Sequence, residues 1–302
     1  MSIVVVGSSN TDMIIKVAHL PLPGETILGG EFTKAAGGKG ANQAVAAARA
    51  GGEVNFIARV GDDIFGESAI NGFMEDNINV DWVLKDAEAP SGVAQIFVAD
   101  DGENCIAVAS GANARLSVED IENARDVIES ADILLTQLET PVETISKAIS
   151  IARENGKTVI LNPAPAQPLP DELLAKLSVI TPNETEAELL TGVEVVDEAS
   201  AAVATASLKE KGVESVIITM GSKGAFVDHD NEQYMVPGFM VEAVDTTAAG
   251  DTFNGALTVA LSQKKNFKDA VKFANAAAAL SVTKLGAQPS VPSLDEIIDF
   301  LK

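Results

Sequence analysis

The stretch VDTTAAGDTFNGA, at 244–256, combines small residues with two carboxylates just before a pattern typical of a helix. We expect an extended segment at Val241 to Val244 and a helix from Thr252 to Leu261. The free backbone N–H groups and the dipole at a helix N-terminus favour an anion. The small side chains that leave these donors uncovered are those of Ala248, Ala249 and Gly250. The stretch therefore predicts an anion-binding loop.

An acidic residue, Asp251, stands at the same junction and has two interpretations. An isolated aspartate before a helix is most often its N-cap. A carboxylate beside an anion site can instead take the proton from a hydroxyl that attacks a phosphoryl group. The second interpretation explains the bare donor loop and the acid together, whereas the cap explains only the acid. We therefore predict a general base at Asp251.

A second glycine-rich stretch, AAGGKGANQAV at 35–45, matches neither nucleotide-binding template. A P-loop requires Ser or Thr after Lys39, and the dinucleotide fingerprint requires glycine where Gln43 stands. What remains is a Gly-Gly-x-Gly entry into a helix, where backbone can approach a ligand closely and Lys39 and Asn42 supply polar groups. A flexible turn is the alternative. The glycines concerned are Gly37, Gly38 and Gly40.

Polar residues follow several predicted strands at their carboxyl ends, where α/β sheets bind ligands. Asn10 and Asp12 could hydrogen-bond neighbouring sugar hydroxyls, or form an Asx turn. Asn183 and Glu186, in TPNETE, could hold a hydrated Mg²⁺ near phosphates, or Asn183 could simply cap its helix. The small, donor-rich turn TMGSKG, at 219–224, could equally be a hairpin turn. All of these pieces converge on one sheet edge, which predicts one site.

The elements that position these residues alternate between strand and helix, which predicts an α/β fold with a mostly parallel, doubly covered sheet. The expected strands are 3–6, 54–60, 132–138, 158–162, 179–181 and 216–219. The expected helices include 41–51, a capped helix at 117–131, and 142–154.

Two regions, about 11–35 and 92–111, have strand character without a crossover helix. We expect them to form a small β-sheet that projects from a single domain spanning 1–302 and acts as a lid. An antiparallel extension of the main sheet is the alternative.

Composition excludes several classes of protein. A formal charge of −23 argues against nucleic-acid and anionic-membrane partners. His19 and His229 are the only histidines and lie in no ligand-like cluster, so zinc or histidine-triad catalysis is poorly supported. Cys105 is the only cysteine, and there is no membrane-spanning run or basic signal-peptide region, so we expect the reducing cytoplasm.

The motifs GGKGANQA, NPAPA, PNETE, TMGSKG, DTTAAGDTFNGA, FANAAAALSVT and GAQPS follow one another across nearly the whole chain. In this set and order the sequence resembles the ribokinase-like (PfkB-type) carbohydrate kinases. The resemblance implies a three-layer α/β/α domain with a β-sheet lid that also forms a homodimer contact. It also implies transfer of the γ-phosphoryl group of MgATP to the 5-hydroxyl of D-ribose, with K⁺ as an activating cation.

The resemblance also implies roles for individual residues. Asp251 is the base, and Ala248, Ala249 and Gly250 form the anion hole. The sugar side comprises Asn10, Asp12, Gly38, Lys39, Gly40, Asn42 and Glu139. The nucleotide side comprises Asn183, Glu186, Thr219, Gly221, Ser222, Lys223, Gly224, Gly250 and Asn275. The positions for K⁺, several of them backbone carbonyls, are Asp245, Thr247, Ser281, Lys284, Gly286 and Ser290.

One position departs from the family pattern, because Ala248 stands where glycine is usual. The donor there is a backbone N–H, so a methyl group leaves it intact if φ is negative. The nearest rival function is a deoxyribokinase, whose substrate lacks the 2-hydroxyl that Asp12 could bind. A catalytically silent sugar-binding or regulatory protein is a third interpretation, which the presence of Asp251, Gly250 and Asn183 disfavours.

Overall fold

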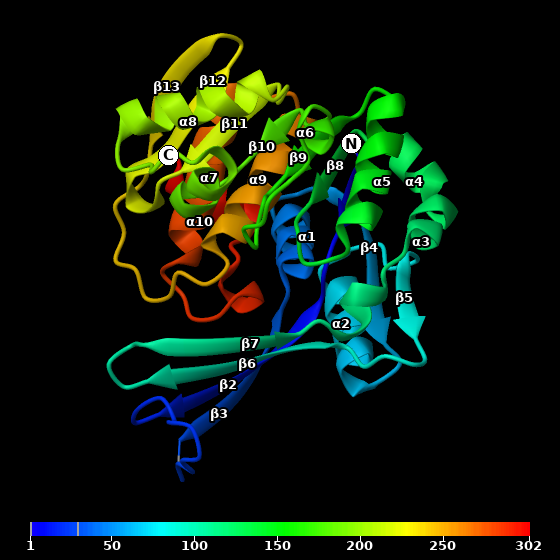
Figure 1. The fold of residues 1–302 in the computed structure, drawn as a ribbon, viewed down its shortest axis with the longest axis vertical. Coiled ribbons are helices and arrows are strands. Elements are labelled where there is room, and N and C mark those ends of the chain that lie inside the picture. The colour runs from blue at the N-terminus through cyan, green and yellow to red at the C-terminus, as the bar shows by residue number, and fades with distance from the viewer. Residues whose placement is uncertain (1, 29) are drawn as a thin grey trace.

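The computed structural model describes residues 2–28 and 30–302. It contains two separate β-sheets (Figure 1). The larger sheet has nine strands in the order β13-β12-β11-β10-β9-β8-β1-β4-β5. Their bounds are β1 Ser2–Val6, β4 Glu53–Gly61, β5 Val83–Asp86, β8 Ile133–Thr136, β9 Thr158–Leu161, β10 Val179–Ile180, β11 Ser215–Thr219, β12 Gly224–His229 and β13 Glu232–Pro237.

The centre of this sheet is parallel, and only the β11–β12 and β12–β13 pairings at one edge are antiparallel. Parallel sheets are covered on both faces, so their strands are continuous apolar runs. β1 is an example, because its Ile-Val-Val-Val run is fully buried. It pairs in parallel with β4 and β8 on either side. The predicted fold class is therefore confirmed.

Helices cover both faces of the large sheet and enclose two apolar cores. One core is formed with α1 Lys39–Arg49, α2 Ile64–Glu75, α9 Ala249–Ser262, α10 Phe267–Ser281 and α11 Leu294–Phe300. The other is formed with α3 Val118–Asn123, α4 Arg125–Ser130, α5 Val142–Glu154, α6 Asp171–Leu174, α7 Glu184–Thr191 and α8 Glu198–Glu210. The result is three layers. Within the described residues, no helix combines the length and apolarity needed to cross a membrane.

The smaller sheet has the strand order β3-β2-β6-β7 and extends away from the three layers (Figure 1). Its strands are β2 Asn10–Val17, β3 Glu31–Gly37, β6 Gly92–Ala99 and β7 Asn104–Ala109. It is a sheet of its own and not an antiparallel extension of the main sheet, because β2 bonds only β3 and β6. All six residues of its outer strand β7, including Cys105, are exposed.

Three expected elements differ from the structure. The helix expected over 117–131 begins with the predicted capping box but breaks at Ala124, where ψ is 10°, into α3 and α4. The strand expected over 132–138 ends at Thr136, because the next residues turn toward the site. No strand forms over 241–244, since the amide of Val244 bonds the carbonyl of Val282, at the C-cap of α10, and not a neighbouring strand.

Candidate active site

The N-terminus of α9 opens onto a cavity of about 210 Å³. The helix begins at Ala249, three residues before the predicted start, so Asp251 lies inside the first turn and not at its junction. Ala249 donates its amide to the carbonyl of Thr246 at 3.2 Å. Among the described residues, the amides of Ala248, Gly250 and Asp251 have no acceptor, so three donors remain available. A Cβ added at Gly250 would meet nothing within 4 Å, so these donors are uncovered.

Asp251 does not cap α9. The N-cap is Ala248, which offers no side-chain bond, and the carboxylate of Asp251 points back to α1. There its Oδ2 accepts from Asn42 Nδ2 at 2.9 Å and its Oδ1 from Gln43 Nε2 at 2.9 Å. Its side chain is buried but lines the cavity. The carboxylate is thus held by two donors at the mouth of an anion site.

Buried amides fix the orientation of Gln43. Its Oε1 accepts from Gln137 Nε2 at 2.6 Å, so its Nε2 must face Asp251 and Asn162. Asn254 extends the network, because its Nδ2 donates to the carbonyl of Gly250 at 2.8 Å. The network therefore connects the acid, the helix start and the ends of β8 and β9.

Burial and neighbouring charges raise the pKa of two carboxyl groups here. Burial raises the pKa of Asp251, while the Lys39 ammonium and the donors of Asn42 and Gln43 oppose that rise. The pKa of Asp12 is raised to about 6 by burial, then by the charges of Glu139 and Asp251. Three acids thus face one region, and perturbed carboxyl pKa values of this kind are characteristic of functional sites.

The predicted sugar-side residues meet at the junction of the small sheet and α1. Gly38 caps α1 at a φ of 88°, and a Cβ there would lie 2.7 Å from the amide nitrogen of Asn10. Glu139 accepts from the amide of Lys39 at 2.9 Å and from the Ser8 hydroxyl. The Oδ1 of Asn42 is buried without a partner in the described structure. Asn10 and Asp12 lie within β2 and form no Asx turn.

Asn183 and Glu186 are brought together in a way that changes their expected role. Asn183 Oδ1 accepts from the Glu186 amide at 2.8 Å, and Glu186 Oε2 accepts from the Asn183 amide at 2.9 Å, which is a capping box. The capping alternative is therefore correct for Asn183. Glu186 nevertheless lines the cavity, and burial raises its pKa.

A cavity of about 390 Å³ adjoins the first one on the other side of Gly250. Most of the predicted nucleotide-side residues line it, namely Asn183, Thr219, Gly221, Ser222, Gly224, Gly250 and Asn275. Its apolar wall consists of Phe239, Met240, Val241, Ala243, Phe253, Ala278, Ala279 and Val282. Lys223 lies apart, because its ammonium donates to the carbonyl of Val196. The turn at 221–223 also joins the antiparallel strands β11 and β12, as the hairpin alternative supposed. The cavity thus combines polar groups with an apolar lining.

Three of the six positions expected around a monovalent cation are joined by hydrogen bonds beside the α9 loop. Asp245 accepts from the amides of Thr247 and Gly286, at 2.9 and 2.8 Å, and its own amide bonds the carbonyl of Val282. The side chain of Lys284 turns away to Glu296 at 2.8 Å, so only its backbone can serve the loop. One carboxylate and nearby carbonyls are the oxygen donors that a hard cation prefers.

The donor set also fits Mg²⁺. Two carboxylates, Glu186 and Asp251, line the cavity at the α9 start. No group of three or more His, Cys, Asp or Glu side chains suitable for a metal occurs in the part of the chain that the structure describes. Mg²⁺ commonly binds through one or two carboxylates together with waters and phosphates, so a dedicated protein cage is not required.

Ala248 has a φ of 59°, in the left-handed region, so the condition of a negative φ is not met. The conformation brings the chain from the loop into α9 and leaves its amide free. An L-residue there costs about 1–2 kcal/mol. Glycine would avoid that strain.

Sequence reasoning missed the residues that orient Asp251. Gln43 was noted only for not being glycine, although it stands next to Asn42 in the first turn of α1. Gln137 and Asn162 follow β8 and β9 directly, which is the position that marks ligand residues in parallel sheets. The apolar wall around Met240 gave no signal, because it lies in an irregular segment.

The sequence and the fold of this chain are both similar to those of known carbohydrate kinases. Residues 1–294 match the profile of the pfkB family carbohydrate kinases. A ribokinase from Haemophilus influenzae is 48% identical over 301 residues, covering 100% of this chain and 98% of that protein. A deoxyribokinase from Salmonella typhi is 40% identical, with 100% and 99% covered. The structure of an Arabidopsis thaliana ribokinase complexed with ribose and ATP has a TM-score of 0.93 at 33% identity, covering 99% of this chain and 98% of that one.

Proposed function

The chain belongs to the pfkB family of carbohydrate kinases, and from that premise we propose that it is a ribokinase. It transfers the γ-phosphoryl group of ATP to the 5-hydroxyl of D-ribose, giving ribose 5-phosphate and ADP. The observation that carries the proposal is the pairing of Asp251 with three uncovered amides at the start of α9. Full-length identity of 48% to a ribokinase supports the choice of sugar.

In the proposed reaction, Asp251 is the general base. It takes the proton of the sugar 5-hydroxyl while that oxygen bonds the γ-phosphorus and the bond from phosphorus to the β-phosphate oxygen breaks. The amides of Ala248, Gly250 and Asp251 stabilise the charge on the migrating phosphoryl oxygens. The hydrogen bonds from Asn42 and Gln43 favour the ionised form of the carboxylate and orient it. Each group acts at a different atom, so base and anion hole can work together.

The nucleotide occupies the larger cavity in this proposal. Its ring lies on the apolar wall that includes Met240 and Val282, with Asn275 and Gly224 beside it. Its phosphates run past Gly221 and Ser222 toward Gly250, with Thr219 and Asn183 alongside. Glu186, together with waters, would hold Mg²⁺ near the phosphates, and the ion would neutralise phosphate charge there.

A K⁺ ion is proposed for the loop pair that Asp245 and Gly286 join, with Thr247, Ser281, Lys284 and Ser290 as further positions. A cation there would supply positive charge next to the anion hole in a chain of net charge −23. The hydrogen bonds of Asp245 to Thr247 and Gly286 support this, because they hold the loop before α9 against the C-terminal segment.

The sugar is proposed to lie between the small sheet and α1. Asn10, Asp12, Lys39 and Glu139 are the groups that its hydroxyls contact, with Gly38, Gly40 and Asn42 completing the wall. Asp12 is the residue that reads the 2-hydroxyl. Deoxyribokinase remains the second candidate because a protein of that name is 40% identical over the full length.

The proposal extends to the domain organisation, the pairing of two copies and the cellular location. The whole chain acts as one kinase domain in which 11–35 and 92–111 form a lid over the sugar. Two copies pair through this small sheet, whose strand β7 is entirely exposed. A cytoplasmic location agrees with a single exposed cysteine and no possible internal disulfide.

A coupled ADP-release assay tests the proposal with ribose, 2-deoxyribose, fructose and adenosine, each with and without K⁺. Ribose should give the highest kcat/KM, and K⁺ should raise the rate. Asp251→Asn should lower kcat by about 10² to 10⁴, the range for a lost general base. Equal kcat/KM for ribose and 2-deoxyribose would favour the rival, and a mutant within about threefold of wild type would contradict the role of Asp251.

A further inference from the structure

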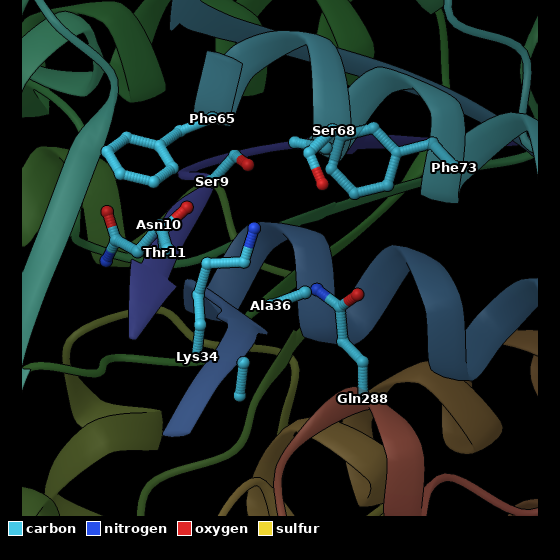
Figure 2. A pocket seen from close by; sticks show the side chains of 11 residues that line it. Ser9, Asn10, Thr11, Lys34, Ala36, Phe65, Ser68, Phe73 and Gln288 are labelled. Carbon is cyan, nitrogen blue, oxygen red and sulfur yellow. The ribbon is translucent and has the colours of Figure 1, made fainter. Parts of the chain in front are cut away.

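A third cavity, of about 60 Å³, lies at the root of the small sheet, separate from both cavities at α9. Figure 2 shows it between β3 and α2, with Phe65 and Phe73 on either side. β2 pairs Thr11 with Ala36 and Asp12 with Ala35. Side chains alternate between the two faces of a strand, so Thr11 and Ala36 lie on the face of the small sheet that lines this cavity, and Asp12 lies on the opposite face. We call it the root cavity.

The root cavity collects hydrogen-bond donors. In Figure 2 the Lys34 ammonium, the hydroxyls of Ser9 and Ser68, and the Gln288 amide point into one space. Among the described residues these three side chains, Lys34, Ser9 and Ser68, have no hydrogen-bond or ion-pair partner; Lys34 only lies 5.8 Å from the ring centre of Phe65. No carboxylate lines the space, in a chain with 44 acidic residues.

Gln288 gives the strongest indication that a ligand belongs here. The residue is only 9% exposed and its Nε2 has no partner in the described structure. A buried amide N–H left unpaired carries a free-energy cost. Its backbone is fixed in η3 Gln288–Ser290, because its carbonyl accepts from Arg49 Nη1 at 2.6 Å. The amide therefore stays in place, and a ligand acceptor would relieve its cost.

We propose that the root cavity binds a small tetrahedral oxyanion such as phosphate or sulfate. A lysine ammonium, a buried amide N–H and two hydroxyls match an acceptor-rich anion, and no acid opposes it. A water needs roughly 10–15 Å³ measured in this way, so the space admits about five heavy atoms, the size of phosphate. That volume does not also hold the sugar of a sugar phosphate, which would have to lie outside, toward the exposed residues Lys34 and Ser68.

The site connects three parts of the molecule. Lys34 and Thr11 belong to the small sheet, Ser68 to α2, and Gln288 to the segment that follows Gly286. β3 continues through Gly37 directly into α1 and the sugar-side junction. An anion bound here holds β3 against α2, and so limits how far the small sheet can move. The inference is drawn from residues of the root cavity alone, and only the blocking of the anion hole at α9 in the test below rests on the proposed function.

Calorimetric titration of the full-length protein tests the site, with phosphate as the ligand and chloride at matched ionic strength as the blank. D-ribose and β,γ-methylene-ATP are present in excess, so that the anion hole at α9 is filled. Wild type should give saturable phosphate binding, and sulfate should compete with it. Ribose 5-phosphate should not compete with phosphate. If ribose 5-phosphate competed as well as free phosphate does, the proposal of a free oxyanion as the ligand would be overturned.

Three variants locate the binding. Lys34→Met keeps the aliphatic stem beside Phe65 and should weaken the phosphate Kd at least tenfold. Gln288→Leu should do the same, and should raise the Tm measured without phosphate. Lys265→Met is the matched control, because Lys265 lies in the same way 5.9 Å from the ring centre of Phe273, away from the cavity; its Kd should equal that of wild type.

Hydrogen exchange gives a second readout that needs no enzyme activity. Phosphate should slow exchange in β3 at 34–37 in wild type and Lys265→Met, but not in Lys34→Met. Absence of saturable binding in wild type, or an unchanged Kd in Lys34→Met, would overturn the proposal. Failure of these tests would leave the kinase assay unaffected, and failure of the kinase assay would leave these tests interpretable.

Discussion

Replacing Gln43 by leucine isolates the contribution of one hydrogen bond to the proposed base. Gln43 Nε2 donates to Asp251 Oδ1 at 2.9 Å, and the bond from Gln137 at 2.6 Å fixes the amide in that orientation. Leucine has a similar size but no donor. The change removes a partner of the ionised carboxylate and leaves the second donor, Asn42, in place.

The magnitude follows from the charge of the acceptor. A hydrogen bond to a charged group contributes about 1.5–3 kcal/mol, and one pKa unit corresponds to about 1.4 kcal/mol. The donor of Gln43 lowers the pKa of Asp251, so its loss should raise that pKa. A base works only when ionised. The acid limb of kcat should therefore move to higher pH.

The assay is kcat against pH at saturating ribose and ATP, with ADP release as the signal. Gln233→Leu is the matched control, because Gln233 donates to Asp228 at 2.7 Å and lies outside both cavities at α9. Both variants should be less stable, but only Gln43→Leu should shift the acid limb. An acid limb at the same pH in both variants would refute the positioning role.

Ala248→Gly should raise Tm by up to about 2 °C, because glycine adopts the left-handed conformation of residue 248 without strain. Ala249→Gly, the control within α9, should lower Tm. A fall in Tm for both variants would contradict the backbone strain at Ala248. Asp12→Asn should stabilise the ligand-free protein at pH 8 by up to about 3 kcal/mol, since the folded protein disfavours the ionised acid. Denaturant titrations should show that gain disappear as pH falls through about 6 toward 4, and a constant gain would exclude titration of Asp12. Asn183→Ala and Asn266→Ala each remove an N-cap and should cost about 1 kcal/mol. Only Asn183→Ala should raise KM for ATP, so equal KM values would remove Asn183 from the nucleotide site.

Elements with strong local signals could be predicted from the sequence. α5 occupies 142–154 as expected, because its apolar spacing and its buried Ile145 and Ile149 agree. The start of α9 could not be placed, because small residues at 248–250 carry no helix signal and Ala248 enters through an unusual φ. The segment at 241–244 reads as a strand locally, but no strand edge is available to pair with it.

The candidate site was predictable in its types of residue but not in its connections. A carboxylate after a small-residue loop predicts Asp251, and strand ends predict Asn183 and Thr219. The bond from Gln43 to Asp251 joins residues 208 positions apart, and no local pattern encodes it. For Asn183, two interpretations that the sequence offers as alternatives are both correct, because it caps α7 and also lines the larger cavity.

The thiol of Cys105 is the only one in the chain and is exposed on the outer strand of the small sheet. A maleimide dye would therefore label the native sequence at a single known point, with no cysteine to remove or introduce. Trp82, the only tryptophan, directly precedes β5, the strand at one edge of the large sheet. Energy transfer between this tryptophan and the dye would read out swinging of the small sheet in real time.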